Sequence, residues 1–259
     1  MDKIKTIIGK EWAEVFKNRL VLFTVAFLPL LLVAMPLLMV GLTGAELDEA
    51  DALPEAISAT LCAGLSHTDC FHYYMLSLFT LMFMILPVMV PVTIAAYSIV
   101  GEKTTRSLEP LLATPITTLE LLTGKMLAAI LPAVFVTWLT YLLFMVGVWF
   151  TASTAVFNAL LGPMWLLAIL VVGPLLALFS VSIAIMVSSR VNDPRVAEQL
   201  SGAVIIPIIL LLVGQSVGFM LLSPTLVLVA AVIVAVLDVA LVYLAIQTFE
   251  RENILTRWK

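Results

Sequence analysis

Long apolar segments without charged residues alternate along the chain with short segments that carry charge. A helix needs about 20 predominantly apolar residues to cross the hydrocarbon core of a bilayer. The uncharged stretch over residues 126–189 has room for two such helices, with a polar break beginning at residues 151–154. The pattern predicts six membrane-spanning helices, over residues 20–41, 73–100, 126–150, 163–187, 203–222 and 226–248.

The first 19 residues predict a different kind of helix. Apolar side chains recur there at helical spacing, and the lysines fall largely on other sides of the helix. A basic amphipathic helix of this kind lies at a membrane surface. The apolar positions are Ile4, Ile7, Ile8, Trp12, Val15 and Phe16. We therefore expect an interfacial helix over residues 1–19, joined to the spans in one transmembrane domain over residues 1–259.

Composition agrees with this reading. Hydrophobic residues make up 63% of the chain and charged residues 12%, whereas a soluble domain carries about 25% charged residues. The mean hydropathy is +1.17. So little polar surface excludes a water-soluble fold and predicts an all-α integral membrane protein.

The basic residues predict the orientation. With six spans, all 13 Lys and Arg residues fall on the side of the N-terminus. The long outer loop over residues 42–72 lies on the other side and contains acidic residues without any Lys or Arg. The positive-inside rule then places both termini in the cytoplasm of a multi-pass protein of the plasma (inner) membrane.

The loop over residues 101–125 reads GEKTTRSLEPLLATPITTLELLTGK and mixes charged residues with leucines. It is too polar for a span and predicts two short helical pieces. Thr117 and Glu120 have the spacing of a capping box at the start of the third span. A segment that receives force from a cytosolic partner and a solvated loop with its leucines on the headgroups fit this pattern equally well.

The runs Gly101-Glu102-Lys103, 107–115 and Gly124-Lys125, together with Glu120, resemble the loop between the second and third spans of ABC type-2 export permeases. The branch concerned includes sodium-export, gliding-machinery and nitrous-oxide-reductase-maturation permeases. The resemblance extends to the N-terminal helix, the six spans and their orientation, and implies the ABC type-2 exporter fold. In that family the loop holds a coupling helix that docks in a groove of the nucleotide-binding subunit. The residues that the resemblance assigns to coupling are Glu102, Arg106, Leu108, Glu109, Leu111 and Leu112.

The second cytoplasmic loop, over residues 188–202, also predicts a short helix. Asp193 followed by Pro194 is a favourable start, with an N-cap residue and then proline at the first helical position. Arg190, Arg195 and Glu198 are candidates for a second contact with the ATPase. A capped turn leading into the fifth span is the simpler interpretation.

The sequence predicts no catalytic site. Phosphate-binding loops of the form G-x-x-x-x-G-K-[ST] are not found, because Leu119 precedes Gly124-Lys125 where glycine is required and Met126 follows. We therefore expect no enzyme activity and no cofactor in this chain, with ATP and Mg²⁺ bound by a separate ATPase subunit. Both histidines, His67 and His72, fall in the outer loop, so no metal site is expected at membrane depth.

Polar residues inside the spans are a further set of candidates. Asp238 lies near the middle of the sixth span, where an acid costs about 2.5–3.5 kcal/mol to insert. Such residues are functional by default, and Gln215, Tyr97 and Tyr141 are candidate partners. A protonated or hydrogen-bonded Asp238 that fixes helix packing is the alternative. The resemblance places the second and fifth spans along the route between two permease copies, which makes Gln215 and Ser216 candidates for substrate contact.

The two cysteines, Cys62 and Cys70, lie close together in the outer loop. Outside the membrane, such a pair favours a disulfide. A metal site built from these cysteines and the two histidines would have no familiar spacing.

These observations predict the permease subunit of an ATP-binding-cassette exporter, moving an unidentified substrate. The expected partners are an ABC ATPase subunit, a second copy of this permease or a similar one, and the lipid bilayer, with no nucleic acid. Two alternatives remain open: an ion-coupled secondary transporter that uses Asp238, and a membrane scaffold or sensor that acts through the outer loop.

Overall fold

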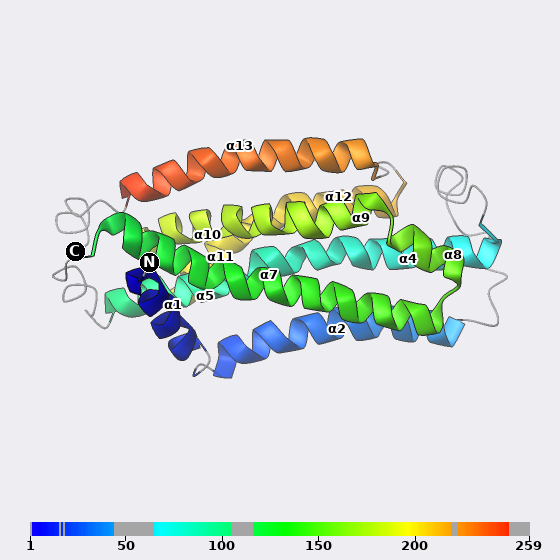
Figure 1. Ribbon diagram of the computed structural model, residues 1–259, viewed down its shortest axis with the longest axis horizontal. Coiled ribbons are helices and arrows are strands. Elements are labelled where there is room, and N and C mark those ends of the chain that lie inside the picture. The colour runs from blue at the N-terminus through cyan, green and yellow to red at the C-terminus, as the bar shows by residue number, and fades with distance from the viewer. Residues whose placement is uncertain are drawn as a thin grey trace.

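The computed structural model describes residues 2–15, 17, 19–43, 65–104, 116–218 and 222–248. Within these ranges the chain is all-α, without a strand, and forms long rods that lie side by side (Figure 1). Six of the rods are long and apolar enough to cross a membrane. The predicted fold class and the predicted number of spans are therefore confirmed.

The helices follow one another as a short amphipathic helix and six spans. Helix α1 is Asp2–Val15, and the first span is α2, Arg19–Thr43. The second span consists of α4 (His67–Met82), the 3₁₀ turn η2 (Phe83–Ile85) and α5 (Leu86–Thr104). The third span is α7, Thr118–Thr151.

The last three spans contain several irregular turns. The fourth span runs through α8 (Thr154–Leu160), α9 (Pro163–Leu167), the π-helical turn η3 (Ala168–Val172) and α10 (Gly173–Arg190). The fifth consists of α11 (Pro194–Gly202), the 3₁₀ turn η4 (Ala203–Ile205) and α12 (Ile206–Ser216). The sixth is α13, Pro224–Thr248.

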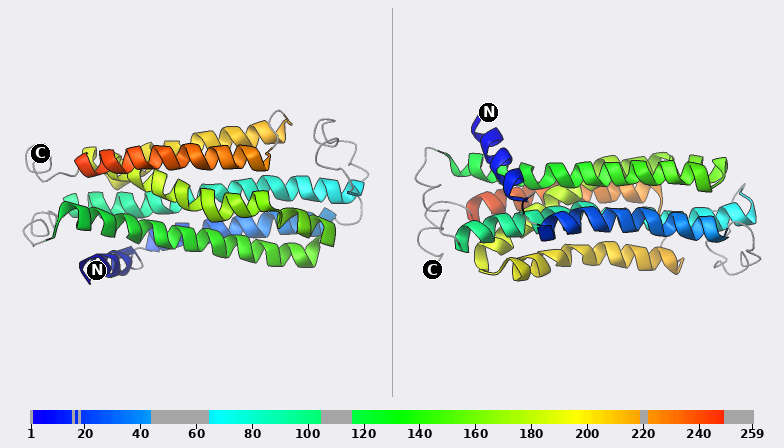
Figure 2. Two further views of the ribbon diagram at one scale, coloured as in Figure 1. Left: turned by 45° about the horizontal axis from the view of Figure 1, so that its top comes forward. Right: turned by 90° about the horizontal axis from the view of Figure 1, so that it is seen from below.

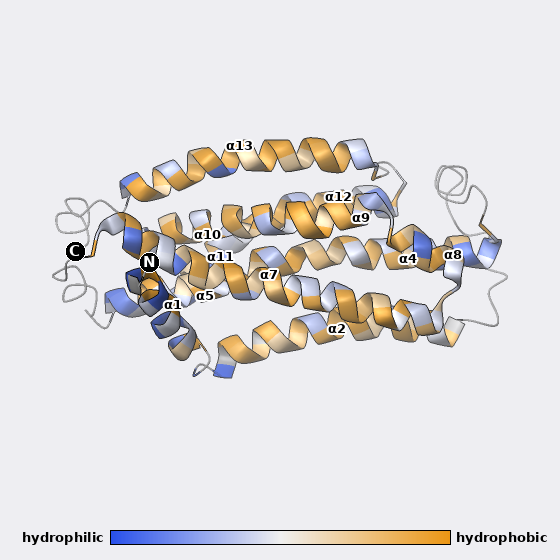
Figure 3. Cartoon of the chain, viewed as in Figure 1, coloured by the Kyte–Doolittle hydropathy of each residue, from blue (hydrophilic) through white to orange (hydrophobic). Residues whose placement is uncertain are grey.

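Helix α1 lies across one end of the bundle, beside the end of α5 and the start of α7 (Figure 2). We call this the basic end, because Lys10, Lys103, Lys125 and Arg190 all lie on the helix segments there. The opposite end carries the end of α2, the start of α4 and α8. Figure 3 shows polar positions gathered toward the two ends of the bundle and apolar positions along the rods between them.

The second span forms the centre of the molecule. In its most apolar stretch 72% of the residues are buried inside the protein, against 17% for the fifth and sixth spans. Helix α5 packs against α10, α7 and α11, and Phe83 meets Phe144 edge-on with 4.9 Å between the ring centroids. A displacement of α5 would therefore be transmitted to the three spans that contain α7, α10 and α11.

Most of the helices extend past the predicted spans. Hydrogen-bonded turns continue into the polar ends of each rod, whereas the sequence pattern marks the apolar part alone. The fifth rod already begins at Pro194, since α11 runs through η4 into α12 without a break. It ends at Ser216, before the predicted limit of 222, because Gly218 adopts a φ of 76° and stops the helix.

Candidate functional site

Buried charged residues join three helices at the basic end. The Lys125 ammonium on α7 lies 2.6 Å from Glu11 Oε1 on α1 and 2.8 Å from Glu102 Oε2 on α5. Lys10, the neighbour of Glu11, donates to Glu102 Oε1 at 2.5 Å. The exposed fractions of Glu11, Glu102 and Lys125 are 2%, 4% and 5%. We refer to Lys10, Glu11, Glu102 and Lys125 as the charged joint.

The charged joint forms because local structure brings each residue to the same place. Helix α7 begins at the N-cap Thr117, and both hydrogen bonds of the predicted Thr117–Glu120 capping box are present, which confirms that prediction. Lys125 follows near the start of this helix. Helix α5 continues to Thr104, so Glu102 falls in its last turn, and Ser98 one turn earlier accepts a further hydrogen bond from Lys125 at 2.8 Å.

Helix α1 fits closely onto α7. A Cβ added at Gly124 would lie 2.8 Å from Ile7 Cγ2, so glycine is needed for this approach. The Trp12 indole nitrogen donates to the Ala128 carbonyl at 3.0 Å. Ile7, Glu11 and Trp12 therefore fix α1 at three successive positions along α7, and the predicted amphipathic helix is anchored on protein at this end.

The charges of the joint balance, with two ammonium groups facing two carboxylates. Burial disfavours the charged form of Lys10, but its hydrogen bond to Glu102 and the nearby Glu14 and Glu11 carboxylates outweigh this and raise its pKa. A buried ion pair contributes little net stability, yet removing one member leaves an uncompensated charge and costs about 3–5 kcal/mol. The charged joint is therefore a specific connection that tolerates little change.

The charged joint stands at the base of the predicted coupling segment. Glu102 precedes residues 105–115 and Lys125 follows them, so one ion pair connects the helices on both sides of that segment. Arg106, Leu108, Glu109, Leu111 and Leu112 lie outside the described residues, and their roles stay predictions. Sequence reasoning missed Lys10, Glu11 and Lys125. A signal for Glu11 existed, since it stands four residues after Ile7 on the apolar face of α1.

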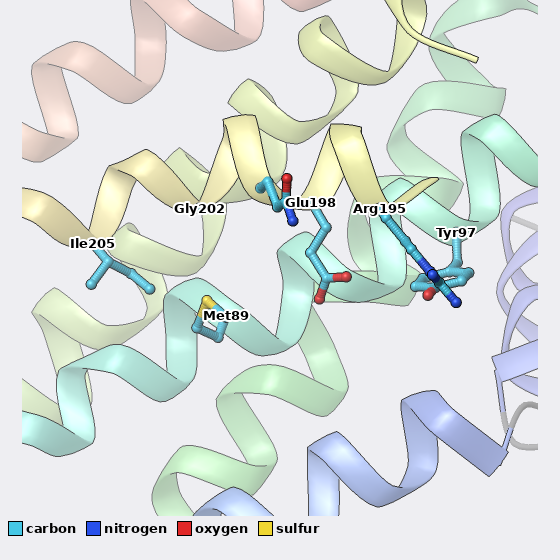
Figure 4. A pocket seen from close by; sticks show the side chains of 7 residues that line it. Met89, Tyr97, Arg195, Glu198, Gly202 and Ile205 are labelled. Carbon is cyan, nitrogen blue, oxygen red and sulfur yellow. The ribbon is translucent and has the colours of Figure 1, made fainter. Parts of the chain in front are cut away.

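A second polar region is an open pocket of about 530 Å³ between α5 and α11 (Figure 4). The Glu198 carboxylate accepts a hydrogen bond of 2.5 Å from the Thr93 hydroxyl on α5. Figure 4 shows Arg195 extending from α11 toward Tyr97 on α5. The lining residues are Met89, Tyr97, Arg195, Glu198, Gln199, Gly202 and Ile205.

The predicted start of α11 is confirmed, with Asp193 as N-cap accepting from the Arg195 amide at 2.8 Å and Pro194 at the first helical position. Two of the predicted second-contact residues, Arg195 and Glu198, line the pocket against α5. Arg190 is exposed at the end of α10. A contact of these residues with an ATPase stays a prediction.

Polar residues also join the second and fifth spans toward the opposite end. The Gln215 amide donates to Ser77 Oγ at 3.2 Å, and the Tyr74 hydroxyl donates to the Ser216 carbonyl at 2.8 Å. Gln215 and Ser77 are both buried. The face shared by these two spans is therefore polar at two levels, at the pocket and at Gln215.

Asp238 does not pair with its predicted partners. Its carboxylate is buried and has no hydrogen-bond partner among the described residues. Gln215 binds Ser77, Tyr141 donates to the Leu160 carbonyl, and Tyr97 lines the pocket. Depth explains the failure for Gln215. This residue is near the end of α12 that lies opposite the basic end, whereas Asp238 lies 14 residues into α13, about 21 Å along a helix.

The predicted disulfide cannot be followed in the structure. Cys70 is buried in the first turn of α4, but Cys62 lies outside the described residues, so their pairing stays a prediction. Among the residues that the structure describes, no three His, Cys, Asp or Glu side chains are grouped so as to hold a metal ion.

The sequence model of a family described as ABC-2 family transporter protein matches residues 5–249, from α1 to the end of α13. No curated protein matches the chain.

Proposed function

This chain belongs to the ABC-2 transporter family, and from that membership we propose that it is the permease subunit of an exporter driven by a separate ATPase subunit. The observation that carries the proposal is the charged joint. It links α1, α5 and α7 at the base of the segment over residues 105–115, where a cytosolic subunit would push.

The joint supports a mechanical role for this end of the molecule. Because Lys125 bonds to both Glu11 and Glu102, a force on residues 105–115 acts on α5, α7 and α1 together. Helix α5 in turn packs against α10 and α11. ATP-driven closure of the partner subunit would thus shift the second, third, fourth and fifth spans as a connected set.

The substrate route in this proposal follows the face between the second and fifth spans. The pocket beside Thr93, Arg195 and Glu198 is its entrance at the basic end, which we assign to the cytoplasm. Its volume falls within the roughly 300–1,000 Å³ of small-molecule sites. The Gln215–Ser77 bond stands farther along the same face, where an outward-moving substrate would pass.

The partner is tested by co-purification. We expect the neighbouring reading frame to encode an ABC ATPase subunit, and the two chains expressed together to form a stable complex that hydrolyses ATP. Charge reversal of Arg106 or Glu109 should lower that hydrolysis while the permease stays in the membrane. The matched control is Lys5→Glu, a reversal on the exposed side of α1. Transport by the purified chain alone, with no ATPase bound in native membranes, would overturn the proposal.

A second candidate function rests on Asp238. Its buried carboxylate without a hydrogen-bond partner in the described residues is what an ion-coupled transporter would use to carry a proton or cation. That function predicts transport that survives ATP depletion, collapses with the ion gradient and is lost in Asp238→Asn. An exporter driven by an ATPase would instead stop transport when ATP is depleted and continue when the ion gradient collapses.

A further inference from the structure

The outer half of the bundle encloses a cavity of about 340 Å³ that is separate from the polar pocket. The second, fourth, fifth and sixth spans all contribute to its walls, and each lining residue is apolar. They include Leu81, Trp165, Ala168, Val204, Ala230 and Leu237.

Irregular turns make room for the cavity. Ala168 and Val172 belong to the π-helical turn η3, and Val204 belongs to the 3₁₀ turn η4, which ends two residues before Pro207. Regular helices tend to pack without such gaps, and single π turns often mark functional positions. Helix α12 packs on α4, whereas α13 packs on α10, and the cavity lies between these two contacts.

The cavity reaches the outer surface of the sixth span. Ile233 and Leu237 line it and are nevertheless 54% and 44% exposed. Along α13 the lining extends from Leu226 to Leu237, which is about 16 Å of helix. It therefore starts near the end opposite the basic end and reaches the middle of the span, the depth at which the bilayer is hydrocarbon.

We propose that a lipid acyl chain, from the leaflet at the end opposite the basic end, occupies this cavity. Water requires two to four polar partners, and the lining residues supply no polar side chain except the indole of Trp165. An empty cavity of this size would forfeit the dispersion contacts of its walls. Hydrocarbon is the apolar material that surrounds Ile233 and Leu237 in a membrane, and no lining residue is charged to select a headgroup.

The experiment uses Trp165, which lines the cavity and is 2% exposed. A variant retains Trp165 and has phenylalanine in place of Trp12, Trp138, Trp149 and Trp258. It is reconstituted in phosphatidylcholine bilayers whose chains carry bromine, a short-range quencher of indole fluorescence. We expect a loss of Trp165 emission. A second variant that retains Trp149, which is 70% exposed, reports contact with bulk lipid.

Two further substitutions separate a chain inside the cavity from lipid outside it. Ala230→Phe fills the cavity and should restore Trp165 emission. Ala240→Phe adds the same ring to the exposed face of the same helix and should leave the quenching unchanged. If Ala230→Phe does not fold, Ala168→Leu places a smaller group in the cavity wall and serves the same purpose.

Two results would overturn the proposal. In the first, brominated chains quench Trp149 but leave Trp165 unchanged, which means that no chain enters. In the second, quenching of Trp165 is equal with and without Ala230→Phe, which places the quencher outside the cavity. No ATPase is needed for these measurements, so their outcome is independent of the proposed export function.

Discussion

Lys125 is the residue on which the arrangement of the basic end depends. Its ammonium forms ion pairs with Glu11 and Glu102 and donates a hydrogen bond to the Ser98 hydroxyl. Lys10 on α1 pairs with Glu102 and balances the second negative charge. Glu11, Glu102 and Lys125 are buried, so water is not available to replace a lost partner among them. The loss of one of these side chains therefore destabilises the remaining charged groups of the joint.

We predict that Lys125→Met lowers stability far more than the loss of an exposed ion pair. It leaves the Glu11 and Glu102 carboxylates buried without their shared cation, at a cost of about 3–5 kcal/mol. The control is Lys3→Met, which removes the exposed Lys3–Glu120 pair and should leave the melting temperature almost unchanged. Thermal unfolding of the purified protein measures both. Equal melting temperatures for the two variants would contradict the assignment.

We predict that Gly124→Ala displaces α1. The new methyl group would meet Ile7 at 2.8 Å, so the amphipathic helix must move away from α7. Combining it with Ile7→Ala should restore the contact. Gly9→Ala, whose added carbon has nothing within 4 Å, should be neutral or slightly stabilising. Protease cleavage within α1 is the measurement, and unchanged protection in Gly124→Ala would show that α1 is held elsewhere.

At this scale the sequence predicted what is local and missed what is distant. The capping box of Thr117 and Glu120 depends on a spacing of three residues, and the family resemblance pointed to Glu102. The partner of Lys125 could not be predicted, because Glu11 stands 114 positions away. The partner proposed for Asp238 failed for a related reason, since a list of polar residues does not give their depths.

Among the elements, α11 has the clearest dependence on a single residue. Asp193 caps its first turn, and Arg195 and Glu198 on this helix form one wall of the polar pocket. The position of that wall therefore depends on a well-formed start of the helix. The bond from Thr93 to Glu198 then ties α11 to α5.

We predict that Asp193→Ala destabilises the start of α11 by about 0.5–2 kcal/mol, the usual cost of losing an N-cap side chain. Asp193→Asn retains an oxygen that accepts from the Arg195 amide and should be nearly neutral. Hydrogen exchange of the first amides of α11 measures the effect. Similar protection in the two variants would mean that Pro194 and the packing on α5 define the helix start without the cap.

The number of spans was predictable and their lengths were not. Apolar runs are dictated by the thickness of the bilayer, so six of them are visible without a structure. The ends of the rods depend on the local backbone conformation, which hydropathy does not predict. Gly218 ends α12 early with its positive φ. Helix α11, predicted as a separate short helix in a cytoplasmic loop, joins the fifth span through η4.

For the molecule as a whole, the distribution of charge predicts which end faces the cytoplasm. With Cys62 and Cys70 replaced by serine, single cysteines at Thr154 and Asn192 report on the two ends of the bundle. A membrane-impermeant maleimide applied to intact cells should label Thr154→Cys. It should label Asn192→Cys only after permeabilisation, because the positive-inside rule places the basic end in the cytoplasm. Labelling of Asn192→Cys in intact cells would reverse the orientation.

The weak burial of the fifth and sixth spans bears on the proposed second copy of the permease. The fifth and sixth spans are equally exposed, at 17% buried, yet the polar pocket and the Gln215–Ser77 bond lie on the fifth. In the proposed exporter, a second chain meeting α12 would complete the substrate route along that face. We therefore predict that Leu210→Cys, 66% exposed on α12, forms a cross-linked dimer on oxidation in the cysteine-free background. Val239→Cys, 74% exposed on α13, should not, because α13 packs on α10. Cross-linking through Val239 instead would move the interface, and with it the substrate route, to the sixth span.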